Sequence, residues 1–252
     1  MTVSEPVRPL ALDRGRDDRL VIVLDRPERR NALDRAAIDA LHAVCAELER
    51  DPRLAIITGR DGVFAAGADI AELRDRGVPE ALEGVNLTLF ERLRRLPMPT
   101  VAAVDGWALG GGAELSYACD FRLATPRTVF GQPETALGII PGAGAAYRLP
   151  RLVGESLAKD MLMTGRRLDA QEARAAGLVR SVHEPGELLD AAHELCDALA
   201  RQSPLALRLT KLAVDAPEGA HPAVELLAQA ILFNDPDKQA RMTAFLDRGS
   251  AR

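Results

Sequence analysis

Two glutamates lie beside glycines in otherwise apolar stretches of the chain. Glu114 ends the run Gly-Gly-Gly-Ala-Glu at 110–114, and Glu134 ends the run Phe-Gly-Gln-Pro-Glu at 130–134. A carboxylate in an apolar environment is costly unless it is paired or used in chemistry. Two such carboxylates, each next to exposed backbone N–H groups, indicate acid–base chemistry on a substrate whose developing charge the backbone stabilises.

The glycine run before Glu114 connects a predicted strand at 100–104 to a predicted helix at 113–119. The first N–H groups of a helix have no partner inside the helix and lie at the positive end of its dipole. Because glycine has no Cβ atom, a ligand oxygen can come close to these groups. The structural alternative is a tight strand–helix turn in which Glu114 only compensates the helix dipole.

Two further segments leave a functional and a structural interpretation open. In the run Phe-Ala-Ala-Gly-Ala-Asp-Ile at 64–70, Asp69 could simply cap a helix, or the small side chains could let a ligand receive a second backbone N–H. A structural Glu134 would need a partner such as Arg148 or Arg151. A catalytic Glu134 would instead face a dry cavity that raises the pKa of its carboxyl group.

The apolar pattern predicts an α/β fold, because strands and helices alternate through the first two thirds of the chain. Short apolar runs predict strands at 20–24, 54–58, 100–104, 121–124, 129–131 and 178–182. Helices are predicted at 34–50, 70–74, 79–95, 113–119, 150–163, 169–176, 187–201, 203–214 and 221–233. The segments 62–69 and 107–112 are expected to be loops. A composition shift near residue 190 divides a core at 1–190 from a helical region at 191–252.

Composition and charge argue against several classes of function. The formal net charge of −5 over 252 residues disfavours a nucleic-acid or membrane partner. The three cysteines lie far apart and the four histidines have no zinc-ligand spacing, so we expect a reducing, cytoplasmic environment and no metal. The N-terminal segment lacks the apolar core of a signal peptide, and no run reaches the roughly 18 apolar residues of a membrane span.

Taken together, these segments resemble the crotonase family, the enoyl-CoA hydratase/isomerase superfamily, from about Leu20 to Phe245. The motifs that carry the resemblance lie at 25–33, 64–70, 110–114, 131–134, 138–144, 148–154 and 173–182. Each motif is short, and their shared order and spacing make a chance match unlikely. The resemblance implies a spiral of ββα units followed by a helical trimerisation region, and therefore a homotrimer or a homohexamer.

The resemblance also implies a site for an acyl-CoA thioester. The backbone N–H groups of Ala68 and Gly111 would form the oxyanion hole for the thioester oxygen. The residues that would contact the CoA part of the substrate are Arg29, Ala32, Ala66, Asp69 and Ile70. Since CoA belongs to the substrate, no separate cofactor is implied.

The two acids distinguish the reactions within the family. Similar hydratases have glutamate at both positions, whereas similar Δ3,Δ2-enoyl-CoA isomerases retain the counterpart of Glu134 and often lack an acid at that of Glu114. The resemblance therefore favours a hydratase that adds water syn across the 2,3 double bond of a trans-2-enoyl-CoA. Glu114 would be the base toward water, and Glu134 would deliver a proton to C2. The alternatives are an isomerase or other CoA-thioester enzyme of the same fold, and a non-catalytic CoA-binding or assembly protein.

The chain departs from the family where well-studied hydratases place lysines near the CoA phosphates. Glu28 and Ala71 stand at these positions. The candidates to replace these lysines are Arg29, Arg30, Arg74 and Arg248. A few relatives bind RNA through a lysine-rich helix, but the three scattered lysines of this chain provide no such patch.

Overall fold

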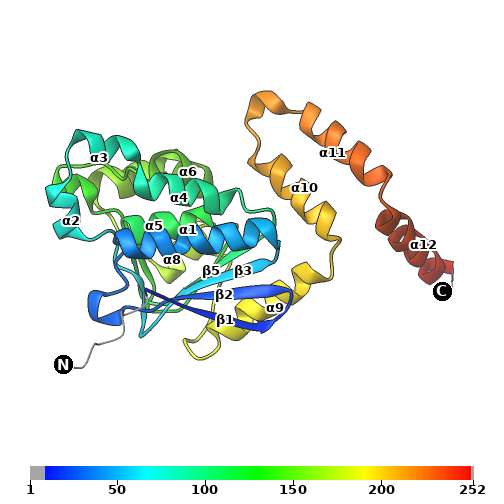
Figure 1. Ribbon diagram of the computed structural model, residues 1–252, viewed down its shortest axis with the longest axis horizontal. Coiled ribbons are helices and arrows are strands. Elements are labelled where there is room, and N and C mark those ends of the chain that lie inside the picture. Colours follow the sequence, from blue (N-terminus) through cyan, green and yellow to red (C-terminus); the bar gives the residue numbers. More distant parts are fainter. Residues whose placement is uncertain (1–8, 251–252) are drawn as a thin grey trace. The chain divides into compact units, whose positions relative to one another are not determined.

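The computed structural model describes residues 9–250, and its larger sheet has six strands in the order β1-β2-β3-β5-β7-β10 (Figure 1). These strands are β1 (Leu10–Arg16), β2 (Arg19–Leu24), β3 (Leu54–Gly59), β5 (Thr100–Val104), β7 (Phe121–Ala124) and β10 (Ser181–Val182). β1 is antiparallel to β2, and the other neighbours are parallel. The predicted strands at 20–24, 54–58, 100–104 and 121–124 are confirmed. β1 was not predicted, because its sequence is mostly polar and its strand conformation comes from pairing with β2.

A smaller sheet has four strands in the order β4-β6-β8-β9. They are β4 (Val63–Ala65), β6 (Trp107–Leu109), β8 (Val129–Gly131) and β9 (Leu168–Asp169). The first three are mutually parallel, and β9 is antiparallel to β8. The predicted loops at 62–69 and 107–112 are therefore partly wrong. Strands of three residues are too short to show an alternating pattern in sequence, and pairing across the sheet defines them.

Consecutive strands alternate between the two sheets, and this alternation produces the expected ββα units. β3, β5 and β7 of the larger sheet are followed by β4, β6 and β8 of the smaller one, and helical segments come next. Because β4, β6 and β8 are parallel neighbours, their carboxyl ends lie at the same edge of the smaller sheet. The segments that begin at 66, 110 and 132 therefore leave the sheet side by side, which brings the two glutamates and the small-residue run together.

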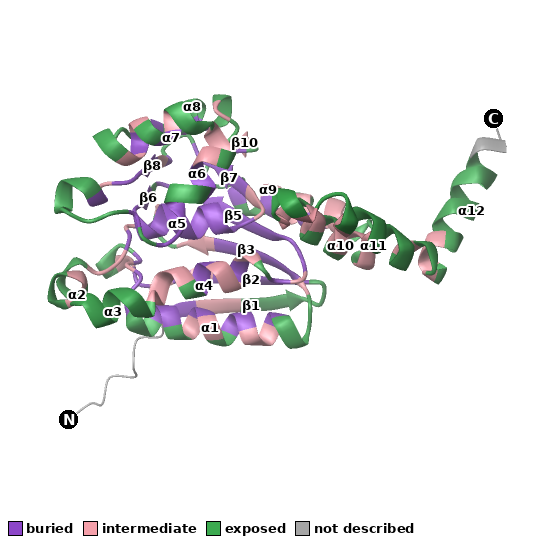
Figure 2. Cartoon of the chain, turned by 90° about the horizontal axis from the view of Figure 1, so that it is seen from above, coloured by how far each residue is buried: buried purple, intermediate pink, exposed green. Residues whose placement is uncertain are grey.

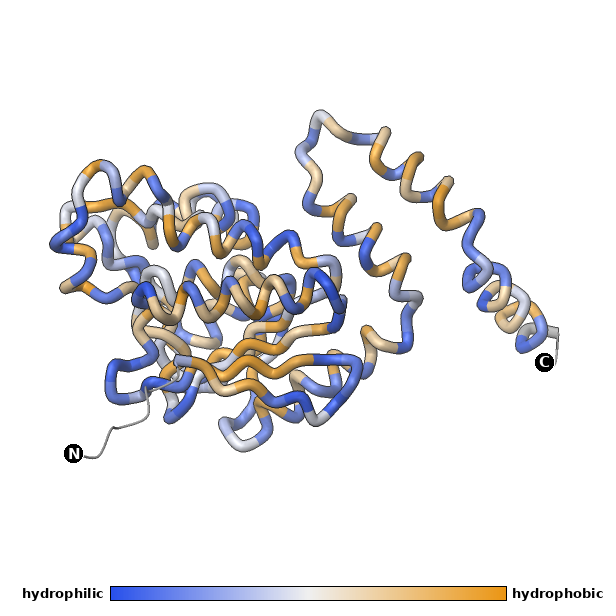
Figure 3. Tube along the Cα trace, viewed as in Figure 1, coloured by the Kyte–Doolittle hydropathy of each residue, from blue (hydrophilic) through white to orange (hydrophobic). Residues whose placement is uncertain are grey.

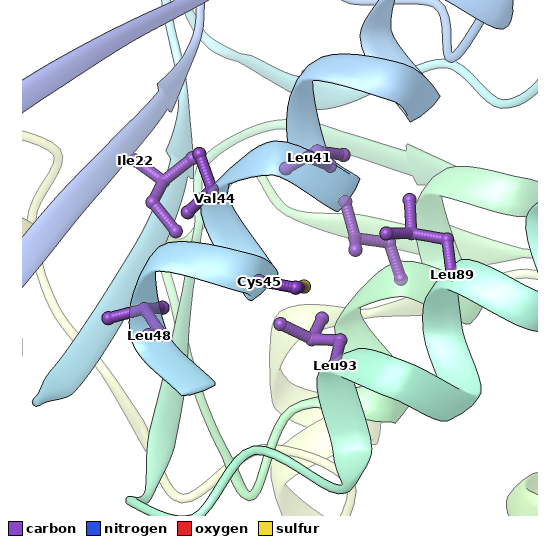
Figure 4. Close-up of a pocket in the computed structure, with 8 residues that line it drawn as sticks. Ile22, Leu41, Val44, Cys45, Leu48, Leu89 and Leu93 are labelled. Carbon is purple, nitrogen blue, oxygen red and sulfur yellow. The ribbon is translucent and has the colours of Figure 1, made fainter. Parts of the chain in front are cut away.

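The core is formed where helices pack against the larger sheet. Asp34 caps α1 (Arg35–Arg50) by accepting a hydrogen bond from the N–H of Ala37 at 3.0 Å, as the sequence predicts. The apolar face of α1 contacts Ile22 of β2 and the leucines of α4 (Val85–Arg94) (Figure 4). Figure 2 shows that the central strands and α5 (Gly111–Ala118) are buried, whereas α2 (Ile70–Asp75) and α3 (Val78–Glu83) are exposed. All three cysteines are buried.

Glycines divide two of the predicted helices. The predicted helix at 79–95 is two helices, α3 and α4, because Gly84 between them has φ +59°. The predicted helix at 150–163 is likewise divided at Gly154, with φ +82°, and α6 already begins at Ala145. The helical segments between residues 145 and 175 are α6 (Ala145–Val153), α7 (Glu155–Lys159), a π-helical turn (Asp160–Thr164) and α8 (Ala170–Ala175). Two short 3-10 turns follow strands: Pro27–Arg29 comes after β2, and Glu134–Leu137 comes after β8.

Contacts between residues divide the chain into two compact units, with the boundary between Glu194 and Leu195. The C-terminal elements are α9 (Leu188–Ala200), which contains this boundary, α10 (Pro204–Asp215), a 3-10 turn (Glu218–Ala220), α11 (Ala223–Phe233) and α12 (Pro236–Ser250). Their apolar residues are interspersed with hydrophilic ones (Figure 3). Large apolar side chains exposed on α10, α11 and α12 are Leu212, Val214, Leu226, Leu227, Ile231, Phe233, Met242, Phe245 and Leu246. Within residues 9–250, no helix is long and apolar enough to cross a membrane.

Candidate functional site

Glu114 lies in the first turn of α5 and is almost completely buried, with 3% of its surface exposed. Its Oε1 atom accepts hydrogen bonds from the backbone N–H groups of Ala143 at 2.8 Å and Ala145 at 3.0 Å. Burial raises the pKa of the carboxyl group, while the two N–H donors and the charge of Arg148 oppose this rise. Because both donors contact Oε1, Oε2 remains to accept a proton from another molecule.

Glu134 begins the 3-10 turn after β8 and is also buried, with 9% of its surface exposed. Burial, reinforced by the negative charge of Glu114, raises the pKa of Glu134 to about 7. The amide nitrogen of Gln132 faces this carboxylate, 2.9 Å from Oε2 and 3.2 Å from Oε1, in the amide orientation that satisfies both groups. The structure therefore places two buried carboxyl groups close enough for the charge of one to affect the pKa of the other.

Arg148 does not pair with Glu134. Its Nη2 atom lies 2.6 Å from Oε1 of Glu91, and its Nη1 atom donates to the carbonyl oxygen of Ala143 at 3.1 Å. Among the residues that the structure describes, no ion pair joins Glu134 to Arg148 or Arg151. The structural interpretation of Glu134 required such a partner, so this arrangement argues for a chemical role.

The backbone at Ala68 and Gly111 forms the second feature of the site. The N–H of Leu33 donates to the carbonyl of Gly67 at 2.8 Å, which fixes the turn before Ala68. A Cβ atom added to Gly111 would lie 3.5 Å from the nitrogen of Ala68, so the two backbone segments are adjacent. Gly111 is the first residue of α5, and its N–H therefore has no acceptor within the helix.

The glycines on either side of Gly111 have different reasons to be glycine. Gly110 has φ +49°, and a Cβ atom there would lie 2.6 Å from Oε1 of Glu134. A Cβ atom on Gly112 would lie only 2.1 Å from the carbonyl oxygen of Ala65, at the end of β4. Gly110 therefore makes room for the acid, and Gly112 lets α5 approach the smaller sheet.

The residues expected to contact CoA lie on neighbouring segments. Ala66 donates its N–H to the carbonyl of Arg30 at 3.0 Å, which links the 64–70 run to the loop after β2. The guanidinium group of Arg29 lies 3.9 Å from a carboxylate oxygen of Asp69. The Ala32 carbonyl accepts from Arg26 at 2.7 Å, and the side chain of Ile70 is exposed.

Asp69 has the structural role that the sequence offered as an alternative. Its carboxylate caps α2 by accepting from the N–H groups of Ala71 at 2.9 Å and Glu72 at 3.2 Å. The cap also fixes the chain direction next to Ala68.

Several residues that organise this site have no functional signal of their own in the sequence. The buried Asn31 donates to the carbonyl of Val63 at 2.6 Å and accepts from the N–H of Arg26 at 2.9 Å, so it links the loop after β2 to the start of β4. Gln132 and Glu91 are further examples. Asn31 and Gln132 lie within the motifs at 25–33 and 131–134, whereas Glu91 lies in none of the motifs and acts through a long-range contact with Arg148.

These groups can together perform proton transfer next to a developing oxyanion. One buried carboxylate is supported by backbone donors, and the other has a pKa near neutrality. The backbone nitrogens of Ala68 and Gly111 lie at the end of the parallel strands, where such an oxyanion could bind. Within the described part of the chain, no group of three or more His, Cys, Asp or Glu side chains could hold a metal ion.

Comparisons with known proteins point in the same direction. Residues 18–252 match the sequence profile of a family described as enoyl-CoA hydratase/isomerase. A short-chain-enoyl-CoA hydratase of Clostridium acetobutylicum is 37% identical over 237 residues, which cover 90% of this chain and 91% of the relative. A crotonyl-CoA hydratase of Syntrophomonas wolfei is 39% identical over 242 residues, covering 92% of each chain. The crystal structure of an enoyl-CoA hydratase from Bacillus anthracis superimposes with a TM-score of 0.89 at 34% identity, covering 95% of this chain and 96% of the other.

Proposed function

Because this chain belongs to the enoyl-CoA hydratase/isomerase family, we propose that it is a hydratase that adds water syn across the 2,3 double bond of a trans-2-enoyl-CoA. The observation that carries the proposal is the pair of buried carboxyl groups, Glu114 and Glu134, beside the N-terminus of α5. Hydration needs a base for water and an acid for carbon, and the chain provides one carboxyl group for each task.

Glu114 is the base. The N–H groups of Ala143 and Ala145 stabilise its ionised form and fix its orientation through Oε1. Oε2 accepts a proton from the water molecule while the water oxygen forms its bond to C3. The charge of Arg148 also favours the ionised form and compensates part of the cost of burying it.

Glu134 is the acid. Its pKa of about 7 keeps a substantial fraction protonated near neutral pH, unlike an ordinary glutamic acid. As the C2=C3 double bond is consumed, electron density moves toward the thioester carbonyl, and Glu134 then gives its proton to C2. The proton taken up by Glu114 and the proton lost by Glu134 leave the charge of the pair unchanged.

The backbone N–H groups of Ala68 and Gly111 bind the thioester oxygen. Negative charge develops on this oxygen before C2 is protonated, so fixed donors lower the energy of that state more than the energy of the bound substrate. The helix dipole of α5 adds positive potential at the same place.

Crotonyl-CoA is the substrate for the decisive test. Loss of the conjugated-enoyl absorbance on addition of the protein, with formation of 3-hydroxybutyryl-CoA, is the expected result. A 3-enoyl-CoA tests the alternative, since the near-neutral pKa of Glu134 would also suit an isomerase that moves one proton. Faster conversion of the 3-enoyl-CoA than hydration of 2-enoyl-CoAs of several chain lengths would replace the hydratase proposal with an isomerase.

Arg29, Ala32, Ala66, Asp69 and Ile70 lie along the path proposed for CoA. Arg29 is exposed and positively charged, so it is available to contact a phosphate. Replacing Arg29 with alanine should raise KM for crotonyl-CoA several-fold with little change in kcat, because a phosphate contact is the same in the substrate and the transition state.

The helical region at 191–252 is the proposed oligomerisation region of a homotrimer or homohexamer. Its exposed apolar side chains support this assignment, since a monomer seldom exposes so many. Sedimentation equilibrium measures the mass directly.

We further propose that no cofactor, metal or nucleic acid is required, so dialysis against EDTA and nuclease treatment should leave the rate unchanged. The scattered, buried cysteines are consistent with a cytoplasmic location.

A further inference from the structure

Asn86 brings a polar side chain to the backbone groups proposed to bind the thioester oxygen. It lies in the first turn of α4, directly after the break at Gly84. A Cβ atom on Gly111 would lie 3.4 Å from Nδ2 of Asn86 and 3.5 Å from the nitrogen of Ala68. The Asn86 amide and the two backbone segments therefore border the same small space.

The other end of the Asn86 amide has no partner. Its Oδ1 atom is buried and makes no hydrogen bond with any residue in the described part of the protein. A buried acceptor without a donor is unfavourable, so this amide does not act as a structural link between α4 and its neighbours. The residues of α4 that do pack inward, Leu89, Phe90 and Leu93, are apolar.

We propose that Asn86 is a further catalytic residue, whose side-chain N–H donates a third hydrogen bond to the thioester oxygen beside the N–H groups of Ala68 and Gly111. This inference rests on the proposed function, because it concerns the same acyl-CoA substrate. An amide donor gains strength as charge develops on the oxygen, so its contribution is larger in the transition state than in the bound substrate. The sequence shows no motif at Asn86, and only the fold places α4 next to Gly111.

Two variants separate a donor from a packing residue. Asn86→Leu keeps the branched side chain with the same number of heavy atoms and removes the N–H, whereas Asn86→Asp keeps the shape and puts negative charge beside the developing oxyanion. We expect Asn86→Leu to lower kcat for crotonyl-CoA about 10- to 100-fold with less than about a threefold change in KM, and Asn86→Asp to lower kcat further. Thr88→Val, an exposed change on the same helix, is the matched control and should keep the wild-type kcat.

A spectroscopic measurement tests the hydrogen bond without relying on turnover. A conjugated aryl enoyl thioester, cinnamoyl-CoA, absorbs at longer wavelength when its carbonyl is polarised. Binding to the wild-type protein and to Thr88→Val should give the same red shift, and binding to Asn86→Leu a smaller one. Because Oδ1 lacks a partner, Asn86→Leu should also unfold at the same temperature as the wild type or a higher one.

These experiments distinguish failure of the Asn86 inference from failure of the hydratase proposal. If the wild-type protein hydrates crotonyl-CoA but Asn86→Leu retains the full kcat and red shift, the Asn86 inference is wrong and the hydratase proposal stands. A milder effect of Asn86→Asp than of Asn86→Leu would also overturn the inference, because it would indicate packing. If no enoyl-CoA is hydrated but the red shift still depends on Asn86, the hydratase proposal fails and the inference is supported.

Discussion

The surroundings of Glu114 and Glu134 differ although both carboxyl groups are buried. Glu114 receives two backbone N–H donors, from Ala143 and Ala145, and the charge of Arg148 acts on it. Glu134 receives the side-chain amide of Gln132, and the negative charge of Glu114 raises its pKa further. Burial raises the pKa of both carboxyl groups, but the backbone donors and Arg148 oppose this rise at Glu114, whereas the charge of Glu114 adds to it at Glu134. This difference favours Glu114 as the proposed base and Glu134 as the proposed acid.

The largest loss of activity is expected when each acid is removed in turn. Glu114→Gln and Glu134→Gln should each lower kcat for hydration by about 10²- to 10⁴-fold, because each removes one proton transfer. The two variants should differ in a partial reaction, the exchange of the C2 protons of butyryl-CoA with deuterium from D₂O. That exchange involves only proton transfer at C2, so Glu114→Gln should retain it and Glu134→Gln should lose it.

Mass spectrometry of the recovered thioester gives the deuterium content, and circular dichroism shows whether each variant is folded. Equal loss of exchange in both variants would contradict the assignment of C2 to Glu134. It would mean that the two carboxyl groups act as one unit at the same atom.

The next test concerns the oxyanion site that both acids are proposed to share. A methyl group on Gly111 meets only ordinary contacts, whereas one on Gly112 would lie 2.1 Å from the Ala65 carbonyl oxygen. We expect Gly111→Ala to lower both hydration and C2 exchange by about 10²- to 10³-fold while the protein remains folded. Gly112→Ala should lower stability instead, and thermal unfolding measures the difference.

A folded Gly111→Ala protein with the wild-type rate would show that the thioester oxygen binds elsewhere. A loss of hydration with intact C2 exchange would also contradict a shared oxyanion site, because exchange too passes through negative charge on that oxygen.

The local motifs allowed much of this site to be predicted from sequence. Glu114 and Glu134 stood out because a charged group in an apolar run is unusual, and the fold places them close enough for the charge of Glu114 to raise the pKa of Glu134. The parallel strands β4, β6 and β8 explain the convergence, yet two of the three were predicted as loops. A strand of three residues depends on its neighbours for hydrogen bonds and leaves almost no pattern in sequence.

The supporting groups could not be predicted for a related reason. Asn31, Glu91 and Gln132 act through contacts with residues that are mostly distant in the chain, such as the 2.6 Å pair between Glu91 and Arg148. In the sequence alone, a single asparagine, glutamate or glutamine is compatible with many roles. The sequence shows Gly84 and Gly154, but it does not show their backbone conformation. The preceding helices end there because both glycines have positive φ angles in the structure.

A smaller effect on stability should distinguish the two acids. Folding raises the pKa of Glu134 from 4.5 to about 7, so the folded protein binds more protons than the unfolded chain between these values. The contribution of Glu134 to stability is therefore complete below about pH 4.5 and is lost as the pH rises to about 7. Above pH 7, Glu134→Gln should be more stable than the wild type by about 1–3 kcal/mol, and the difference should shrink below pH 4.5.

Urea unfolding from pH 4 to pH 9 measures this difference. Glu114→Gln should gain less at high pH, because the backbone donors and Arg148 already offset part of the cost of burying the charge. A pH-independent difference for Glu134→Gln, or a larger gain for Glu114→Gln, would reverse the proposed contrast between the two sites.

The smallest expected effect comes from the amide that faces Glu134. Gln132→Met removes the donor that lies 2.9 Å from Oε2, so the ionised form loses stabilisation and the pKa of Glu134 rises. In the pH profile of kcat/KM, the fall at alkaline pH reflects loss of the Glu134 proton. This fall should move to higher pH by about one pH unit. Gln171→Met, an exposed change at the start of α8, is the control and should leave the fall in place. A fall at unchanged or lower pH in Gln132→Met would mean that this amide does not stabilise the carboxylate, and that Glu134 differs from Glu114 through burial and charge alone.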